Sequence, residues 1–105
     1  MRDSRFMHAI SFSMSCSDGT SEEARRILTS ALTRSGEEQE GLEHIRVHTS
    51  RAGARGVMFL IAPDVDQARL GCLAVCERAI ATTAELAGWT AVLHPTATLH
   101  LPDPS

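Results

Sequence analysis

The chain of 105 residues contains no lysine, no tyrosine and no asparagine. Without lysine it has no ε-amino group to form a Schiff base or to act as a general base, which argues against pyridoxal-phosphate chemistry. Its ten strongly basic residues are therefore all arginines. Together with plentiful alanine and glycine, this bias is typical of a GC-rich bacterial genome, and we predict such an origin.

Cysteine is scarce, and long apolar runs are absent. Cys16, Cys72 and Cys76 are odd in number and form no CxxC motif, so the sequence predicts neither a disulfide framework nor a zinc knuckle. No segment approaches the roughly 20 apolar residues of a membrane span. The apolar stretch at residues 6–14 is short and interrupted by polar residues, which argues against a signal peptide. We expect a cytoplasmic protein without a membrane partner.

The overall charge is slightly negative. A formal net charge of -3 and a pI near 5.9 give no general positive field that would attract nucleic acid. The hydrophobic content of 43% is ordinary for a globular protein with one core. We expect a single domain over residues 1–94, followed by a proline-containing tail at residues 95–105.

Hydrophobic periodicity predicts the order strand, helix, strand, strand, helix, strand. The first helix is expected to begin at a capping box on Thr20 and to stop at Ser35–Gly36. The second is expected to begin at a cap on Asp64 and to run to about Leu86. The strands are expected at residues 6–14, 42–49, 57–62 and 89–94, with a hairpin loop at residues 50–55.

This element order is that of a ferredoxin-like split βαβ fold, βαββαβ, which is an α+β architecture. Right-handed crossovers place the four antiparallel strands in the order 4-1-3-2, with both helices on one face of the sheet. The other face is left open. By alternation, we expect its candidate ligand-binding or dimer surface to include Met7, Ser11, Arg46, Met58, Leu60 and Val92.

Histidines and one cysteine are weak candidates for catalysis. His44 and His48 are spaced i, i+4, but on a strand they lie about 13 Å apart, too far to share one metal ion, and we expect no metal site. Cys72 and Cys76 fall on the apolar stripe of the second helix, where a thiol packs as a small hydrophobe. The candidate acids, bases or nucleophiles are His8, His44, His48, His94 and Cys16, the last because it lies near a helix N-terminus.

Arginines near the expected hairpin form a weak candidate anion site. Arg51 and Arg55, with Arg46 nearby, could receive a phosphate or a carboxylate, because a guanidinium makes bidentate contacts with both. Solvated hairpin arginines are the alternative interpretation. The sequence contains no Walker motif and no GxGxxG motif that would indicate a nucleotide site.

The expected third strand resembles the third-strand pattern of RNA-recognition motifs at Arg55, Gly56, Phe59 and Leu60. Val57 and Ala62 stand where that pattern has aromatic residues. The aromatic residues of the first strand, Phe6 and Phe12, are expected on the core side. A base-stacking platform is therefore missing, and we expect no nucleic-acid partner.

In outline the chain looks like the dimeric α+β barrel group, small βαββαβ proteins that pair sheet to sheet. That group includes cofactor-free oxygenases and cyclases of antibiotic pathways as well as noncatalytic members. The similarity lies in element order over about residues 6–94. We expect a homodimer because Met58 and Leu60, near the centre of the open face, would leave an apolar patch in water.

Two functions follow from these observations. The preferred one is a noncatalytic binding or accessory protein that self-associates through its open sheet face and binds a partner or small ligand there. The alternative is a small enzyme of bacterial specialised metabolism, of oxygenase or cyclase type, with a histidine as acid or base. No cofactor is expected in either case.

Overall fold

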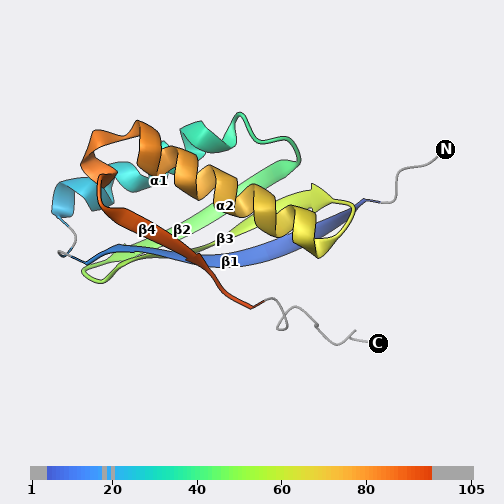
Figure 1. The fold of residues 1–105 in the computed structure, drawn as a ribbon, viewed down its shortest axis with the longest axis horizontal. Helices are drawn as coiled ribbons and strands as arrows, with labels where there is room; N and C mark the ends of the chain where they lie inside the picture. The colour runs from blue at the N-terminus through green and yellow to red at the C-terminus, as the bar shows by residue number, and fades with distance from the viewer. Residues whose placement is uncertain (1–4, 18, 20, 96–105) are drawn as a thin grey trace.

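The computed structural model describes residues 5–17, 19 and 21–95. These residues form one four-stranded sheet and two long helices in the predicted order (Figure 1). The strands are β1 (Phe6–Cys16), β2 (Leu42–Ser50), β3 (Gly53–Ala62) and β4 (Trp89–Leu93). The helices are α1 (Glu22–Gly36), α2 (Val65–Thr82) and the short 3-10 helix η1 (Ala84–Leu86).

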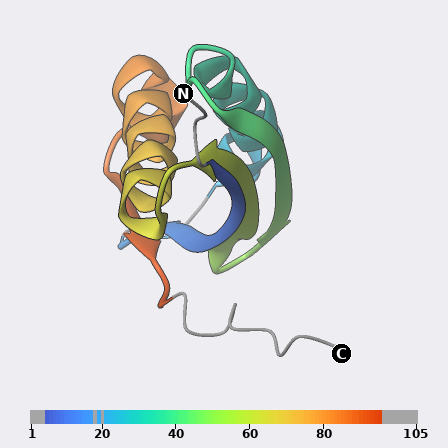
Figure 2. The ribbon, with the colours of Figure 1, turned by 90° about the vertical axis from the view of Figure 1, so that its right-hand side faces the viewer.

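The sheet has the topology that the sequence predicts. Every strand pairing is antiparallel, and the strand order is β2-β3-β1-β4. Read from the other edge, this is the predicted order 4-1-3-2, so the α+β architecture is confirmed. Seen along the strands, α1 and α2 lie side by side on the same face of the sheet (Figure 2). No described element covers the opposite face, which we call the open face.

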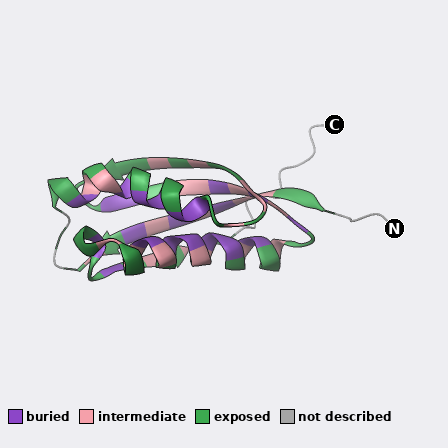
Figure 3. Cartoon of the chain, turned by 90° about the horizontal axis from the view of Figure 1, so that it is seen from above, coloured by how far each residue is buried: buried purple, intermediate pink, exposed green. Residues whose placement is uncertain are grey.

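The core lies between the sheet and the two helices. Along β1, Ile10, Phe12 and Met14 point toward the helices and are buried, because every second side chain of a strand lies on the same face. Each helix turns a buried stripe toward them and an exposed stripe toward solvent (Figure 3). The buried residues of α2 are Ala68, Gly71, Cys72, Val75, Cys76 and Ala79.

Both long helices begin at a side-chain cap. The cap predicted for α1, Thr20, lies outside the described residues, and the N-cap is Ser21, whose hydroxyl accepts a hydrogen bond from the Ala24 amide at 3.0 Å. Asp64 caps α2 as predicted, and its carboxylate accepts from the Gln67 amide at 2.8 Å. Each cap satisfies a backbone donor that the first turn of a helix leaves unpaired.

The second helix is shorter than predicted. α2 ends at Thr82, and Thr83 adopts an extended backbone with φ -124° and ψ 112°. The branched β-carbon of threonine fits an extended backbone better than a continued helix. The remaining stretch up to Leu86 is η1. Within the described ranges, no helix is both long and apolar enough to cross a bilayer.

The hairpin between β2 and β3 is tighter than predicted. Residues 53–55, which the sequence predicts in the hairpin loop, belong to β3, because Ser50 already pairs with Gly53. Gly56 sits against the aromatic ring of Phe12: a β-carbon there would lie 2.6 Å from the ring atom Cζ. The small residues at the start of β3 therefore make room for the large ones of β1.

Met58 and Leu60 lie on the opposite face from the one predicted, and that prediction is wrong. Both side chains point toward the helices, with 0% and 2% of their surface exposed. Residues 57–62 are apolar on both faces, so alternation alone does not decide which set is buried. The register with β1 decides it, because Met58 lies opposite buried Ile10. The open face receives the alternate set, Val57, Phe59 and Ile61.

Candidate functional site

The open face is built of rungs, which are rows of neighbouring side chains that run across the strands. β1 pairs with β3 without interruption from Phe6 to Met14, so residues of the two strands that share a face lie opposite one another. The rungs on the open face are Met7 with Ile61, Ala9 with Phe59 and His44, Ser11 with Val57 and Arg46, and Ser13 with Arg55, His48 and Val92.

One end of the open face is apolar. We call Met7, Ala9, Phe59 and Ile61 the apolar half. The Met7 side chain is 55% exposed, and the other three are half-buried. The His44 ring lies beside Phe59, with the two ring centroids 6.1 Å apart and the planes tilted by 36°. A contiguous apolar surface of this kind is typical of an interaction site.

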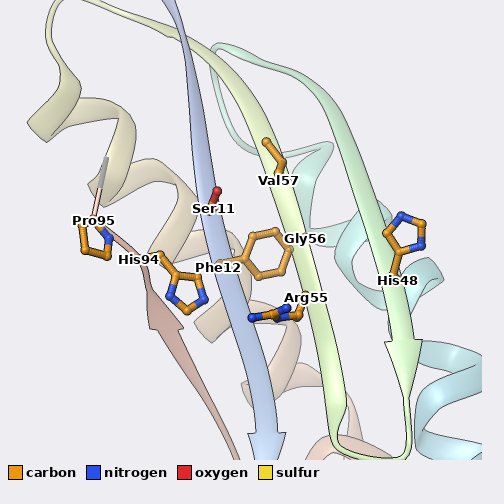
Figure 4. A pocket seen from close by; sticks show the side chains of 8 residues that line it. All are labelled: Ser11, Phe12, His48, Arg55, Gly56, Val57, His94 and Pro95. Atoms are coloured by element: carbon orange, nitrogen blue, oxygen red, sulfur yellow. The ribbon is translucent and has the colours of Figure 1, made fainter. Parts of the chain in front are cut away.

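The other end of the open face holds a shallow, open depression of about 670 Å³, which we call the hollow. Arg55 and His94 extend toward one another across β1, and His48 lies on the far side of β3 (Figure 4). The volume falls within the roughly 300–1,000 Å³ of small-molecule sites. The hollow is lined by Ser11, Phe12, His48, Arg55, Gly56, Val57, His94 and Pro95.

His94 is fixed in the hollow by three hydrogen bonds. Its backbone amide donates to the carbonyl of Ser11 at 2.9 Å, which continues the sheet pairing one residue beyond β4. Its carbonyl accepts from Nη1 of Arg69 in α2 at 2.7 Å. Its ring atom Nε2 lies 2.6 Å from the hydroxyl oxygen of Ser13. With backbone and ring both held, the imidazole has a defined orientation.

The hollowed end of the open face is cationic. Among the described residues, neither the Arg46 nor the Arg55 guanidinium has a hydrogen bond or an ion pair. No acidic residue of the described ranges lines the hollow. All but one of the described acidic residues lie outside the strands, and the exception is Glu43 in β2. A chain of net charge -3 therefore presents uncompensated positive charge on this one face.

The structure brings only some of the predicted site residues together. His8 lies on the helix side of β1, half-buried, with Nε2 3.3 Å from the Ala62 carbonyl oxygen, and Cys16 pairs with Trp89 at the far end of β1. Arg51 is exposed in the turn between β2 and β3. None of these lines the hollow, whereas Ser11, His48, Arg55 and His94 do.

The histidines do not form a metal site in the described part of the chain. His48 and His94 come from opposite edge strands and reach the same hollow, but His44 lies beside Phe59 instead. Within residues 5–17, 19 and 21–95, no three histidine, cysteine or acidic side chains come together in a way that could hold an ion.

Cys72 and Cys76 lie in the core, one helical turn apart on α2. The pKa of the Cys76 thiol is raised well above the ordinary cysteine value, first by its hydrogen bond with Cys72 and then by burial. Only the thiolate is a nucleophile, so the raised pKa disfavours reaction at Cys76, and both buried side chains pack as part of the core.

No protein-family model matches the chain, and no curated protein matches it. Among solved structures, the chain is similar to the intact alpha subunit of aIF2 from Pyrococcus abyssi, with 17% identity and a TM-score of 0.54 over 90% of this chain. It spans 35% of that subunit. A C-terminal segment of the same subunit matches with 17% identity and a TM-score of 0.48, over 85% of this chain and 49% of that one. At this identity, the likeness concerns the fold alone.

Sequence reasoning missed the contact between Ser13 and His94 and the exposure of Phe59. Both depend on register. Strand pairing decides which half of β1 lies beside the short strand β4. It also decides which side chains of β3 face the helices, and a single sequence does not encode this pairing locally. The alternation of apolar residues in β1 indicates which of its side chains face the core. Once the pairing is known, it also indicates which side chains of β3 and β4 face the core.

Proposed function

We propose that this protein is a noncatalytic binding protein that forms a homodimer through its open sheet face and holds a small ligand in the hollow. The observation that carries this proposal is the uncovered apolar half, next to a hollow lined with cationic and hydroxyl side chains. Monomeric proteins seldom leave a contiguous apolar face in water.

The size of the open face supports a second copy of the chain as the occupant. β1 is 11 residues long, so at ~3.3 Å per residue and ~4.8 Å between strands the face covers on the order of 600 Å². A standard interface buries about 800 Å² per partner. Face-to-face pairing therefore supports a dimer of modest affinity.

Symmetry gives this dimer a definite arrangement. A two-fold axis along the strands, between two facing sheets, lays the apolar half of one copy on the apolar half of the other. The same operation closes the hollow of each copy with the partner's cationic end. Facing arginines repel one another, and an anion bound between them relieves this repulsion.

The element order and strand order support a ferredoxin-like fold, and the open face supports membership in the kind of sheet-paired architecture seen in the dimeric α+β barrel group. We further propose a cytoplasmic protein of a GC-rich bacterium with a role in specialised metabolism, on the grounds of its reduced cysteines and its composition.

Sedimentation velocity over a wide range of protein concentration tests the dimer. We expect wild-type protein to shift from monomer to dimer as its concentration rises. Phe59→Gln removes the largest apolar side chain of the apolar half and should leave the protein monomeric. Leu70→Gln is the matched control, because Leu70 is 62% exposed on α2, away from the open face.

Two results would contradict the dimer proposal. One is a wild-type protein that stays monomeric at every concentration. The other is a dimer that Leu70→Gln disrupts and Phe59→Gln does not, which would place the interface on the helices. Circular dichroism of both variants checks that the fold is retained.

The 2.6 Å contact between Ser13 and His94 favours a second candidate, a cofactor-independent enzyme with His94 as acid or base. Within the described residues, no carboxylate orients the imidazole from its other side, and the hollow is open to water. Hydrolysis of p-nitrophenyl acetate tests this candidate. An enzyme requires a rate above that of free imidazole which both Ser13→Ala and His94→Gln abolish, and equal rates in all three proteins exclude it.

A further inference from the structure

We infer that the hollow binds an organic carboxylate with a planar apolar body, such as an aromatic acid. This inference rests on the proposed function, because it takes the open face to be a ligand-binding surface, and it adds the chemical class of the ligand. Three features carry it: a guanidinium that no described residue pairs with, an oriented pair of hydrogen-bonding side chains, and an apolar wall beside them.

Arg55 supplies the charge. Its guanidinium reaches into the hollow toward His94, and no described residue pairs with it (Figure 4). A guanidinium with free donors forms bidentate hydrogen bonds with a carboxylate, and these are shorter and stronger than bonds between neutral groups. In the part of the chain that the structure describes, no acidic residue lines the hollow to compete for Arg55.

Ser13 and His94 supply a second donor whichever tautomer the imidazole adopts. If Nε2 accepts the hydroxyl proton of Ser13, then Nδ1 carries a hydrogen and is a donor. If Nε2 instead donates to the Ser13 oxygen, the hydroxyl proton is free to point at a ligand. Because Arg69 and Ser11 fix the backbone of His94, this pair is held in place before any ligand arrives.

The size and lining of the hollow select an organic acid over a small inorganic anion. The hollow measures about 670 Å³, whereas one water occupies about 30 Å³ of liquid, so a single small ion leaves most of the space unfilled. Val57 and Pro95 line the same hollow as Arg55. A flat apolar body attached to the carboxylate covers these side chains and gains the free energy of their removal from water.

Titration with 2-naphthoate, followed through the backbone amide signals in ¹H–¹⁵N NMR spectra, tests this inference. We expect shifts at Ser11, Ser13, Arg55, Val57 and His94. The neutral isostere 2-naphthamide should bind at least roughly tenfold more weakly, because it lacks the charge that Arg55 recognises. Acetate, which has the charge without the apolar body, should also bind at least roughly tenfold more weakly.

Variants locate the site. Arg55→Gln should weaken 2-naphthoate binding by roughly tenfold or more, because it exchanges a charge-assisted pair for a neutral contact. Arg26→Gln is the matched control, since Arg26 is an exposed arginine on α1, on the helix side of the sheet, and binding should not change. Retained amide dispersion shows that both variants are folded.

The inference is overturned if 2-naphthoate does not bind, if 2-naphthamide or acetate binds equally well, or if Arg55→Gln binds as tightly as wild type. Sedimentation of the wild-type protein with and without 2-naphthoate separates the two proposals. A wild type that binds 2-naphthoate but never dimerises contradicts self-association and leaves the ligand class standing. A dimer that ignores 2-naphthoate contradicts the ligand class alone.

Discussion

The Cys76 thiol shows how strongly the fold acts on one side chain. Its hydrogen bond with Cys72 and its burial both favour the protonated form, so its pKa lies above the ordinary cysteine value. A group whose folded pKa is raised binds its proton more tightly in the folded state. The resulting stability is complete below the unfolded pKa of about 8.5 and is lost as the pH rises above it.

We therefore expect alkaline pH to destabilise the protein through Cys76. Above pH 8.5, the free energy of unfolding should fall by about 1.4 kcal/mol per pH unit for one retained thiol proton. The chain has no lysine and no tyrosine, so few other groups titrate in this range. Urea unfolding at pH 8, 9 and 10 measures the slope.

Substitutions of single cysteines show which residue causes the fall in the free energy of unfolding at alkaline pH. Cys76→Ala should lower stability at pH 8 because it leaves a cavity, but it should flatten the alkaline decline. Cys16→Ala should keep the wild-type slope, because Cys16 lies outside this buried pair. An undiminished slope in Cys76→Ala would show that another group is responsible.

At the scale of elements, the close fit of β1 against β3 depends on Gly56. A β-carbon at this position would lie 2.6 Å from Phe12 Cζ and 2.5 Å from the carbonyl oxygen of Arg46. The backbone of β2 cannot retreat without losing its pairing with β3. We expect Gly56→Ala to lower the free energy of unfolding by about 1–3 kcal/mol.

Gly71→Ala is the matched control for Gly56→Ala. At Gly71 a β-carbon would lie 2.9 Å from Leu60 Cδ2 and 3.2 Å from Gln39 Nε2, which are ends of side chains that can move. Alanine also has a helix propensity better than glycine by about 1 kcal/mol. Urea unfolding of both variants should show the larger loss at Gly56, and equal losses would refute the packing argument.

The sequence predicts elements better than it predicts their ends. Alternation predicts the first two strands, a continuous apolar run predicts the third, and apolar stripes predict both helices, because these patterns follow directly from backbone geometry. The start of β3 differs from the prediction because glycines at positions 53 and 56 are typical of a turn, whereas here Gly53 lies close to the backbone of β1 and Gly56 admits the ring of Phe12. The end of α2 was missed because Ala84 and Leu86 continue a helical pattern after the chain has already turned.

At the scale of the whole molecule, the fold prediction depends on the order of the elements along the chain and on the right-handedness of the crossover connections. The strand order 4-1-3-2 follows from right-handed crossovers, and the structure has that order. The site was harder to predict, because it depends on which face each strand turns outward. Met58 and Leu60 were assigned to the open face and are buried, whereas Phe59 took their place there.

The separation of charge between the strands and the rest of the chain has an electrical consequence. Uncompensated arginines on the open face, and acidic residues mainly on the helices and loops, give the molecule a permanent dipole directed across the sheet. In a low-salt solution, such a dipole turns the open face toward any polyanionic surface, although the protein as a whole is repelled. The net negative charge of the protein therefore does not predict which ligands approach the hollow, because the local positive charge attracts anions there.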